Sequence, residues 1–153
     1  MEYTLDKHPA PEARDAVRFL LSKKGPIGQL CRVLKLGKPR VAFFKRRGTV
    51  GMYISGTTDH PVILLNAAEH VKVEKAVWGV CWPDEIGKSI ESTLVHELGH
   101  AYLESCGVWC GEYEHPEDKV EEATWQWMDS FRDGEGAKKI LDRVVEKVLN
   151  LPG

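Results

Sequence analysis

The residues of this sequence with the clearest chemical potential are two histidines and the glutamate beside the first of them, in His96-Glu97-Leu98-Gly99-His100. Side chains four residues apart on a helix project from the same face, so His96 and His100 can both reach one cation. Glu97 follows His96 by about 100° around the helix axis. That position beside the cation suits a general base better than a ligand.

This arrangement predicts a zinc site that hydrolyses a peptide bond. Zinc held by three protein groups lowers the pKa of a bound water to about 7 and polarises a nearby carbonyl group. Glu97 would accept the proton of this metal-activated water and then pass it to the leaving amine. We therefore expect Zn²⁺ as the cofactor and a peptide or protein as the substrate.

The residues around the motif predict that it lies on a buried helix running from Asp84 to about Ser105. Apolar residues flank the motif on both sides, which a fully exposed helix would not need. Gly99 inside the helix costs about 1 kcal/mol relative to Ala, so we expect another chain segment or a substrate to approach it closely. The residues expected to bury the back of the helix are Leu94, Val95, Leu98, Ala101 and Tyr102.

A third protein ligand is expected, and the residues alone leave more than one candidate for it. Glu121 is favoured because it borders the apolar side of a helix predicted to follow His115-Pro116 and to run to about Arg132. Glu122 points away from that side. His115, just before this helix, is the other alternative. Glu117 stands at the frayed start of the helix and is set aside. The apolar side is defined by Val120, Ala123, Thr124, Trp127, Met128 and Phe131.

The rest of the chain predicts an α+β fold in a single domain, residues 1–153. Helices are expected from Pro11 to Gly25 and from Pro26 to Leu36. Two strands, 41–44 and 50–54, are expected to pair through a Gly-containing turn. A further strand is expected at Pro61–Asn66. The segment 67–82 is ambiguous. After Gly134 and Gly136 a last helix carries a packing stripe of Ala137, Ile140, Leu141, Val144, Val145, Val148 and Leu149.

Composition and cysteine usage argue against a membrane protein and a secreted protein. No run of about 18 apolar residues exists, which argues against a membrane span. The polar N-terminus offers no secretory core, so we expect a cytoplasmic protein. Four cysteines, Cys31, Cys81, Cys106 and Cys110, are expected as reduced thiols, with a local disulfide between the last two as the alternative.

Basic residues gather in one part of the chain. Between Ala16 and Thr58 there are ten Lys and Arg residues and no acidic ones, while all 23 Asp and Glu residues lie outside that stretch. A solvated surface or an attraction between two parts of one domain accounts for this split. The alternative is contact with a nucleic acid through the stretch from Arg18 to Arg47.

The order of motifs resembles that of small gluzincin metallopeptidases: the ImmA/IrrE-like proteins, the archaeal minigluzincins and related phage-encoded proteins. The resemblance covers roughly Val50 to Phe131. It rests on Gly-Met-Tyr-Ile at 51–54, Val-Ile-Leu-Leu-Asn at 62–66, Thr-Leu-Val-His-Glu-Leu-Gly-His-Ala at 93–101 and the acidic helix that follows.

The resemblance implies a minimal zincin fold: N-terminal helices, a small twisted sheet, an active-site helix, a glutamate helix and a C-terminal helix. It also implies that the strand Pro61–Asn66 rims the cleft and pairs with an extended substrate. The family's glutamate ligand carries over best to Glu121. In such families an Asp or Asn about a turn later often supports a ligand histidine; Trp125 stands there after Glu121, and Gln126 after Glu122.

Two further hypotheses accompany the metallopeptidase one. The motif followed by His115 is also similar to SprT-like proteases, which act on DNA-bound proteins; that resemblance implies His115 on the metal. The other hypothesis is a weakly active regulatory zinc protein that binds a partner in its cleft. In the leading hypothesis, His115 or Tyr113 is the candidate for stabilising the oxyanion.

Overall fold

The computed structural model describes residues 3–108 and 116–150, which form an α+β fold, as the sequence predicts. In chain order the elements are β1 (Thr4–Leu5), α1 (Pro11–Leu20), α2 (Pro26–Val33), β2 (Arg40–Lys45), β3 (Gly51–Tyr53), β4 (Val62–Leu65), α3 (Ala67–Trp78), α4 (Pro83–Ser105), α5 (Glu117–Asp129) and α6 (Gly134–Leu149). No helix in these ranges is long and apolar enough to cross a membrane.

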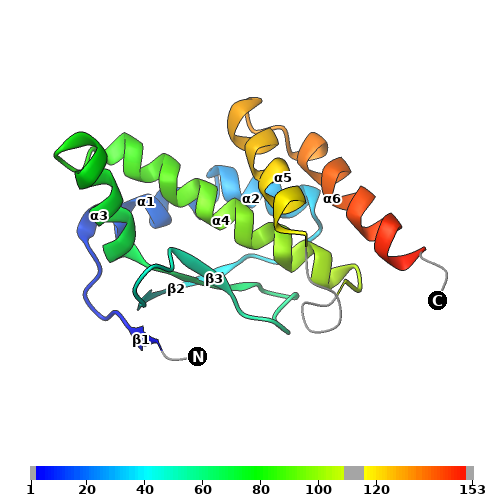
Figure 1. The fold of residues 1–153 in the computed structure, drawn as a ribbon, viewed down its shortest axis with the longest axis horizontal. Helices are drawn as coiled ribbons and strands as arrows, with labels where there is room; N and C mark the ends of the chain where they lie inside the picture. Colours follow the sequence, from blue (N-terminus) through cyan, green and yellow to red (C-terminus); the bar gives the residue numbers. More distant parts are fainter. Residues whose placement is uncertain (1–2, 109–115, 151–153) are drawn as a thin grey trace.

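The long helix α4 is the element around which the others pack (Figure 1). The sheet lies on one side of it, while α5 and α6 lie on the other. Leu94, Leu98 and Ala101 are fully buried, and Val95 and Tyr102 nearly so. The prediction that the back of this helix is buried is therefore confirmed, and hydrophobic burial fixes which face of α4 remains for chemistry.

The sheet differs from the prediction in how its strands pair. Its order is β1-β2-β4-β3, with β4 parallel to β2 and antiparallel to β3. The predicted hairpin of β2 with β3 is therefore wrong. The physical reason lies in β4, where Ile63, Leu64 and Leu65 are all buried. An apolar strand of this kind is stabilised most in the interior of a sheet, where both of its faces are covered.

Helix α3 fills the segment whose pattern is ambiguous in the sequence. The Asn66 side chain caps it by accepting a hydrogen bond from the Glu69 backbone N–H at 3.1 Å. Gly79 ends it in the left-handed conformation, with φ of 80°. Both are ordinary helix boundary signals in the sequence. The apolar pattern between them is obscured because Val73, Val77 and Trp78 are exposed.

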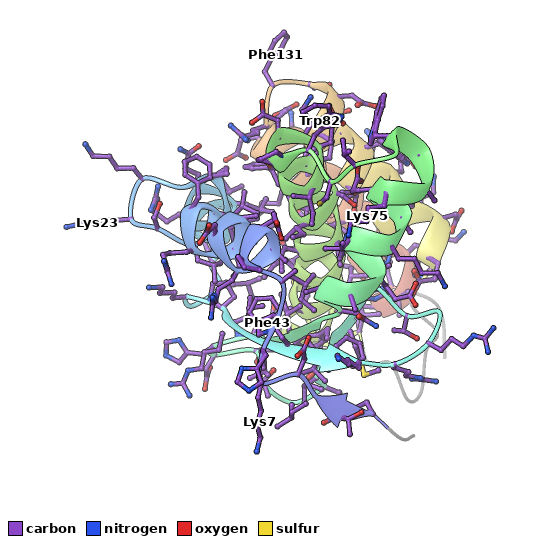
Figure 2. All side chains as sticks on the ribbon, turned by 90° about the vertical axis from the view of Figure 1, so that its left-hand side faces the viewer. Lys7, Lys23, Phe43, Lys75, Trp82 and Phe131 are labelled. Atoms are coloured by element: carbon purple, nitrogen blue, oxygen red, sulfur yellow. The ribbon has the colours of Figure 1, made fainter. Side chains whose placement is uncertain are left out.

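Several helix ends also differ from the prediction. Helix α2 ends at Val33, and Lys35 adopts a φ of 55°. Helix α5 begins at Glu117, with Pro116 as its N-cap, and ends at Asp129. Phe131 lies beyond that end with a φ of 54° and projects into solvent (Figure 2), so it is not part of the apolar side of α5.

The tightest approach between the sheet and α4 is at Gly51. A Cβ atom at this position would lie 2.4 Å from Cγ2 of Thr93. We expect Gly51→Ala to lower the free energy of unfolding by about 1–3 kcal/mol, because the added methyl group overpacks the contact. Urea denaturation measures this change.

Thr93→Ser provides the matched background for this test. It removes Cγ2 but keeps the hydroxyl, which lies 3.2 Å from Nε2 of His70. Most of the cost of Gly51→Ala should disappear in that background. An equal cost in both backgrounds would show that the strand does not press on Thr93.

Candidate metal centre

His96 and His100 lie one above the other on α4, with ring centroids 5.0 Å apart. The His96 side chain is 22 % exposed and that of His100 is 10 % exposed. Both rings are therefore held partly inside the protein while one side of each stays accessible. This is the arrangement that the spacing of four residues predicts.

Glu117, the first residue of α5, lies across from both rings. One carboxylate oxygen is 2.9 Å from Nε2 of His96, and the other is 2.9 Å from Nε2 of His100. The donor atoms of His96, His100 and Glu117 all lie within 4.8 Å of one another. Among the residues that the structure describes, these three form a group that could hold a metal ion.

Glu121, the favoured third ligand from the sequence, has a different place. Its carboxylate lies 2.9 Å from Nδ1 of His96, the ring nitrogen opposite the one that faces Glu117. A carboxylate in this position holds the proton on Nδ1 and leaves Nε2 available for a metal. The structure thus brings both glutamates to His96, with Glu117 on the side shared with His100.

Among the described residues, the structure does not bring the other candidate from the sequence, Glu122, to the two histidines. Glu122 pairs with Lys119 at 2.9 Å, on a side of α5 away from the histidines. His115 and Tyr113, the candidates for an alternative ligand and for oxyanion stabilisation, lie outside the described residues.

Close packing of α5 on α4 puts the glutamates in place. A Cβ atom at Gly99 would lie 3.0 Å from Cγ1 of Val120, so this glycine lets α5 approach closely, as its presence in the helix predicts. Ala123 and Thr124, further along α5, are small and buried. Because Val120 sits against Gly99, Glu117 one turn earlier falls beside His96 and His100.

Glu97 lies next to this group on α4 and is 9 % exposed. Burial raises the pKa of its carboxyl to about 7. The His96 ring lowers it, the Glu117 carboxylate raises it further, and hydrogen bonding to the Tyr53 backbone lowers it. A carboxyl with a pKa near neutrality is well suited to exchange protons at physiological pH.

Strand β3 forms the rim of the site nearest Glu97. A Cβ atom at Gly51 would lie 3.7 Å from Cγ of Glu97, an ordinary contact distance, so the strand runs directly beside this side chain. The loop after β3 is held to the end of α4, where the Glu104 carboxylate accepts hydrogen bonds from the Ser55 hydroxyl at 2.9 Å and from the Gly56 backbone N–H at 2.5 Å.

This geometry corrects the expectation that Pro61–Asn66 rims the cleft. Strand β4 is paired on both sides, by β2 and by β3, and offers no free edge for another chain. Strand β3 pairs with β4 alone among the described strands. The strand at the edge of the sheet next to the metal group is therefore β3.

Comparisons of this chain with protein-family models, with curated proteins and with solved structures found no match.

Alanine substitutions distinguish a metal ligand from a supporting carboxylate. With zinc as the probe, we expect Glu117→Ala to weaken metal binding by more than about 100-fold, because two nitrogens and water complete the site poorly. Glu121→Ala should cost about 10–100-fold, as is typical of a residue that orients a ligand histidine. Competition with a chelator of known affinity measures both constants.

Glu122→Ala is the matched control, since it removes the same charge from the same helix away from the histidines. It should leave zinc affinity within about twofold of the unaltered chain. If Glu121→Ala weakens binding more than Glu117→Ala does, Glu121 is the ligand and the assignment of the two carboxylates is reversed.

Proposed function

We propose that this protein is a zinc-dependent metallopeptidase that hydrolyses peptide bonds. The observation that supports this most directly is the convergence of His96, His100 and Glu117, with Glu97 buried beside them. Two imidazole nitrogens and one carboxylate oxygen are a donor set that catalytic zinc uses, with one position left for water or substrate. A structural zinc site would instead use four protein ligands.

Each residue has a distinct role in this proposal. Zinc, when bound, would acidify a water molecule and polarise the substrate carbonyl group. Glu97 accepts the proton of that water and then donates it to the nitrogen of the leaving amine. Glu121 keeps the His96 ring oriented through Nδ1. Its distance of 2.9 Å from that atom suits this role.

The exposed edge of β3 supports an extended peptide as the substrate. A strand at the edge of a sheet presents backbone N–H and C=O groups that a second chain can pair with. Because β3 runs beside Glu97, a peptide paired with its edge would carry its backbone past the proposed base. We therefore propose β3, in place of β4, as the strand that holds the substrate.

The other expectations stay predictions. A SprT-like role needs His115 on the metal, and His115 lies outside the described residues. Contact of the basic stretch with DNA likewise rests on the sequence alone. A cytoplasmic location is in keeping with free thiols at Cys31, Cys81 and Cys106; Cys110, the second half of the alternative disulfide, lies outside the described residues.

Glu97→Gln tests the proposed reaction. The amide keeps the shape of the side chain but cannot accept a proton, so we expect zinc content and the free energy of unfolding to be kept. The rate of cleavage of an unfolded protein such as casein should fall by about two or more orders of magnitude. Fluorescence release from labelled casein measures this rate.

Glu146→Gln is a suitable control, because it makes the same change on the exposed side of α6, away from the metal group. Its effect on the rate should be far smaller. Activity of Glu97→Gln equal to that of the unaltered chain would require another proton acceptor. Zinc binding without any cleavage by the unaltered chain would favour the regulatory zinc protein.

A further inference from the structure

A groove runs along α4 between α3 and α5, with a volume of about 600 Å³. Its floor includes the small residues Ser89, Ser92 and Thr93 of α4. Val73 of α3 and Trp125 of α5, both exposed, stand on its two sides. Figure 2 shows α3, which carries the labelled Lys75, beside α4.

The groove leads to the metal group along each of three elements. On α4, Ser89, Ser92 and His96 follow one stripe at helical spacing. On α5, Trp125 comes one turn after Glu121, which contacts His96. On the sheet side, Val50 lines the groove and is followed by Gly51, the residue closest to Glu97. A chain lying over the metal group would therefore continue into the groove.

Glu74 of α3 lines this groove and is 8 % exposed. Its carboxylate has no hydrogen bond and no ion pair within residues 3–108 and 116–150. The residue is thus enclosed by its neighbours, while its carboxylate oxygens stay accessible from the groove, where a cation can pair with them. The chain thus keeps an acid in a sheltered position of the groove without supplying its partner.

The other groups in the groove leave its charge negative. Glu85 and Asp129 also line it, and the one ammonium group there, that of Lys88, lies 3.7 Å from Glu85. His70 is held by Ser89 at 2.9 Å and Thr93 at 3.2 Å. Burial lowers the pKa of His70 to about 4, so this ring adds no positive charge near neutral pH.

We propose that this groove binds a basic side chain, arginine or lysine, of the peptide substrate, with Glu74 as the partner of its charged end. Trp125, on the α5 side of the groove, also suits an arginine or lysine side chain. Its indole face attracts the cationic end and packs against the aliphatic part of such a side chain. From Ser89 to His96 is about 10 Å along the helix. An extended peptide covers that length in about three residues, so the basic residue lies within about three residues of the bond to be cleaved.

This inference rests on the proposed peptidase function, so its test measures binding without turnover. The full-length chain carrying Glu97→Gln is loaded with zinc and titrated into two fluorescein-labelled nine-residue peptides. Both peptides are acetylated, amidated and built from Ala and Ser. One carries a central Arg and the other a central citrulline, which has a similar shape but no charge. Fluorescence anisotropy gives the two dissociation constants.

We expect the Arg peptide to bind about tenfold or more tightly than the citrulline peptide. Adding Glu74→Gln should bring that ratio close to one and leave the citrulline peptide's affinity unchanged. Glu146→Gln, an identical change in charge on the exposed side of α6, should leave the ratio intact. Trp125→Ala should weaken the Arg peptide more than the citrulline peptide.

Equal binding of the two peptides, no measurable binding of either, or a ratio that survives Glu74→Gln would overturn the proposal. The failure of the proposed function is a separate outcome. A preference for Arg that depends on Glu74, in a protein whose unaltered form cleaves no peptide, would keep the groove as a binding site for basic segments and remove only the peptidase.

Discussion

The site depends on one contact, the packing of Val120 in α5 against Gly99 in α4. A Cβ atom at Gly99 would lie 3.0 Å from Cγ1 of Val120, so any larger residue here would push the two helices slightly apart. The close approach places one turn of α5 over the two histidines, so Glu117 and Glu121 reach opposite nitrogens of His96. The glycine, which costs about 1 kcal/mol inside a helix, thus brings together the side chains of two helices that could hold a metal ion.

The sequence was sufficient for the parts of this site that lie on one helix. A period of 3.6 residues places His96 and His100 together and buries Leu94 and Leu98 behind them, whatever the rest of the fold does. The third carboxylate depends on where a second helix begins and how it packs, which local pattern cannot determine. The frayed start assigned to Glu117 led to Glu121 instead. Glu117 and Glu121 are one turn apart on α5, so both carboxylates can reach His96 once this helix packs on α4.

The sheet shows the same limit. Each strand could be predicted from its alternating apolar and polar residues or from its continuous apolar run. The pairing of strands could not, because it is a contact between segments that lie far apart in the sequence. The expected hairpin of β2 with β3 followed from their closeness in sequence, whereas burial of all of Ile63, Leu64 and Leu65 requires β4 between them. The position of β4 between β2 and β3 has a functional consequence, because it leaves β3 at the edge of the sheet beside Glu97. Glu74 could not have been singled out at all, since its burial arises only when α3 lies against α4.

The central claim is that His96, His100 and Glu117 hold zinc through nitrogen and oxygen alone. X-ray absorption at the zinc edge of the purified, zinc-loaded chain tests it most directly. The account predicts a first shell at about 2.0–2.1 Å that contains nitrogen and oxygen only, with the outer scattering of two imidazoles. Sulfur at about 2.3 Å would show that cysteines bind the metal. That result, or the absence of imidazole scattering, would contradict the account.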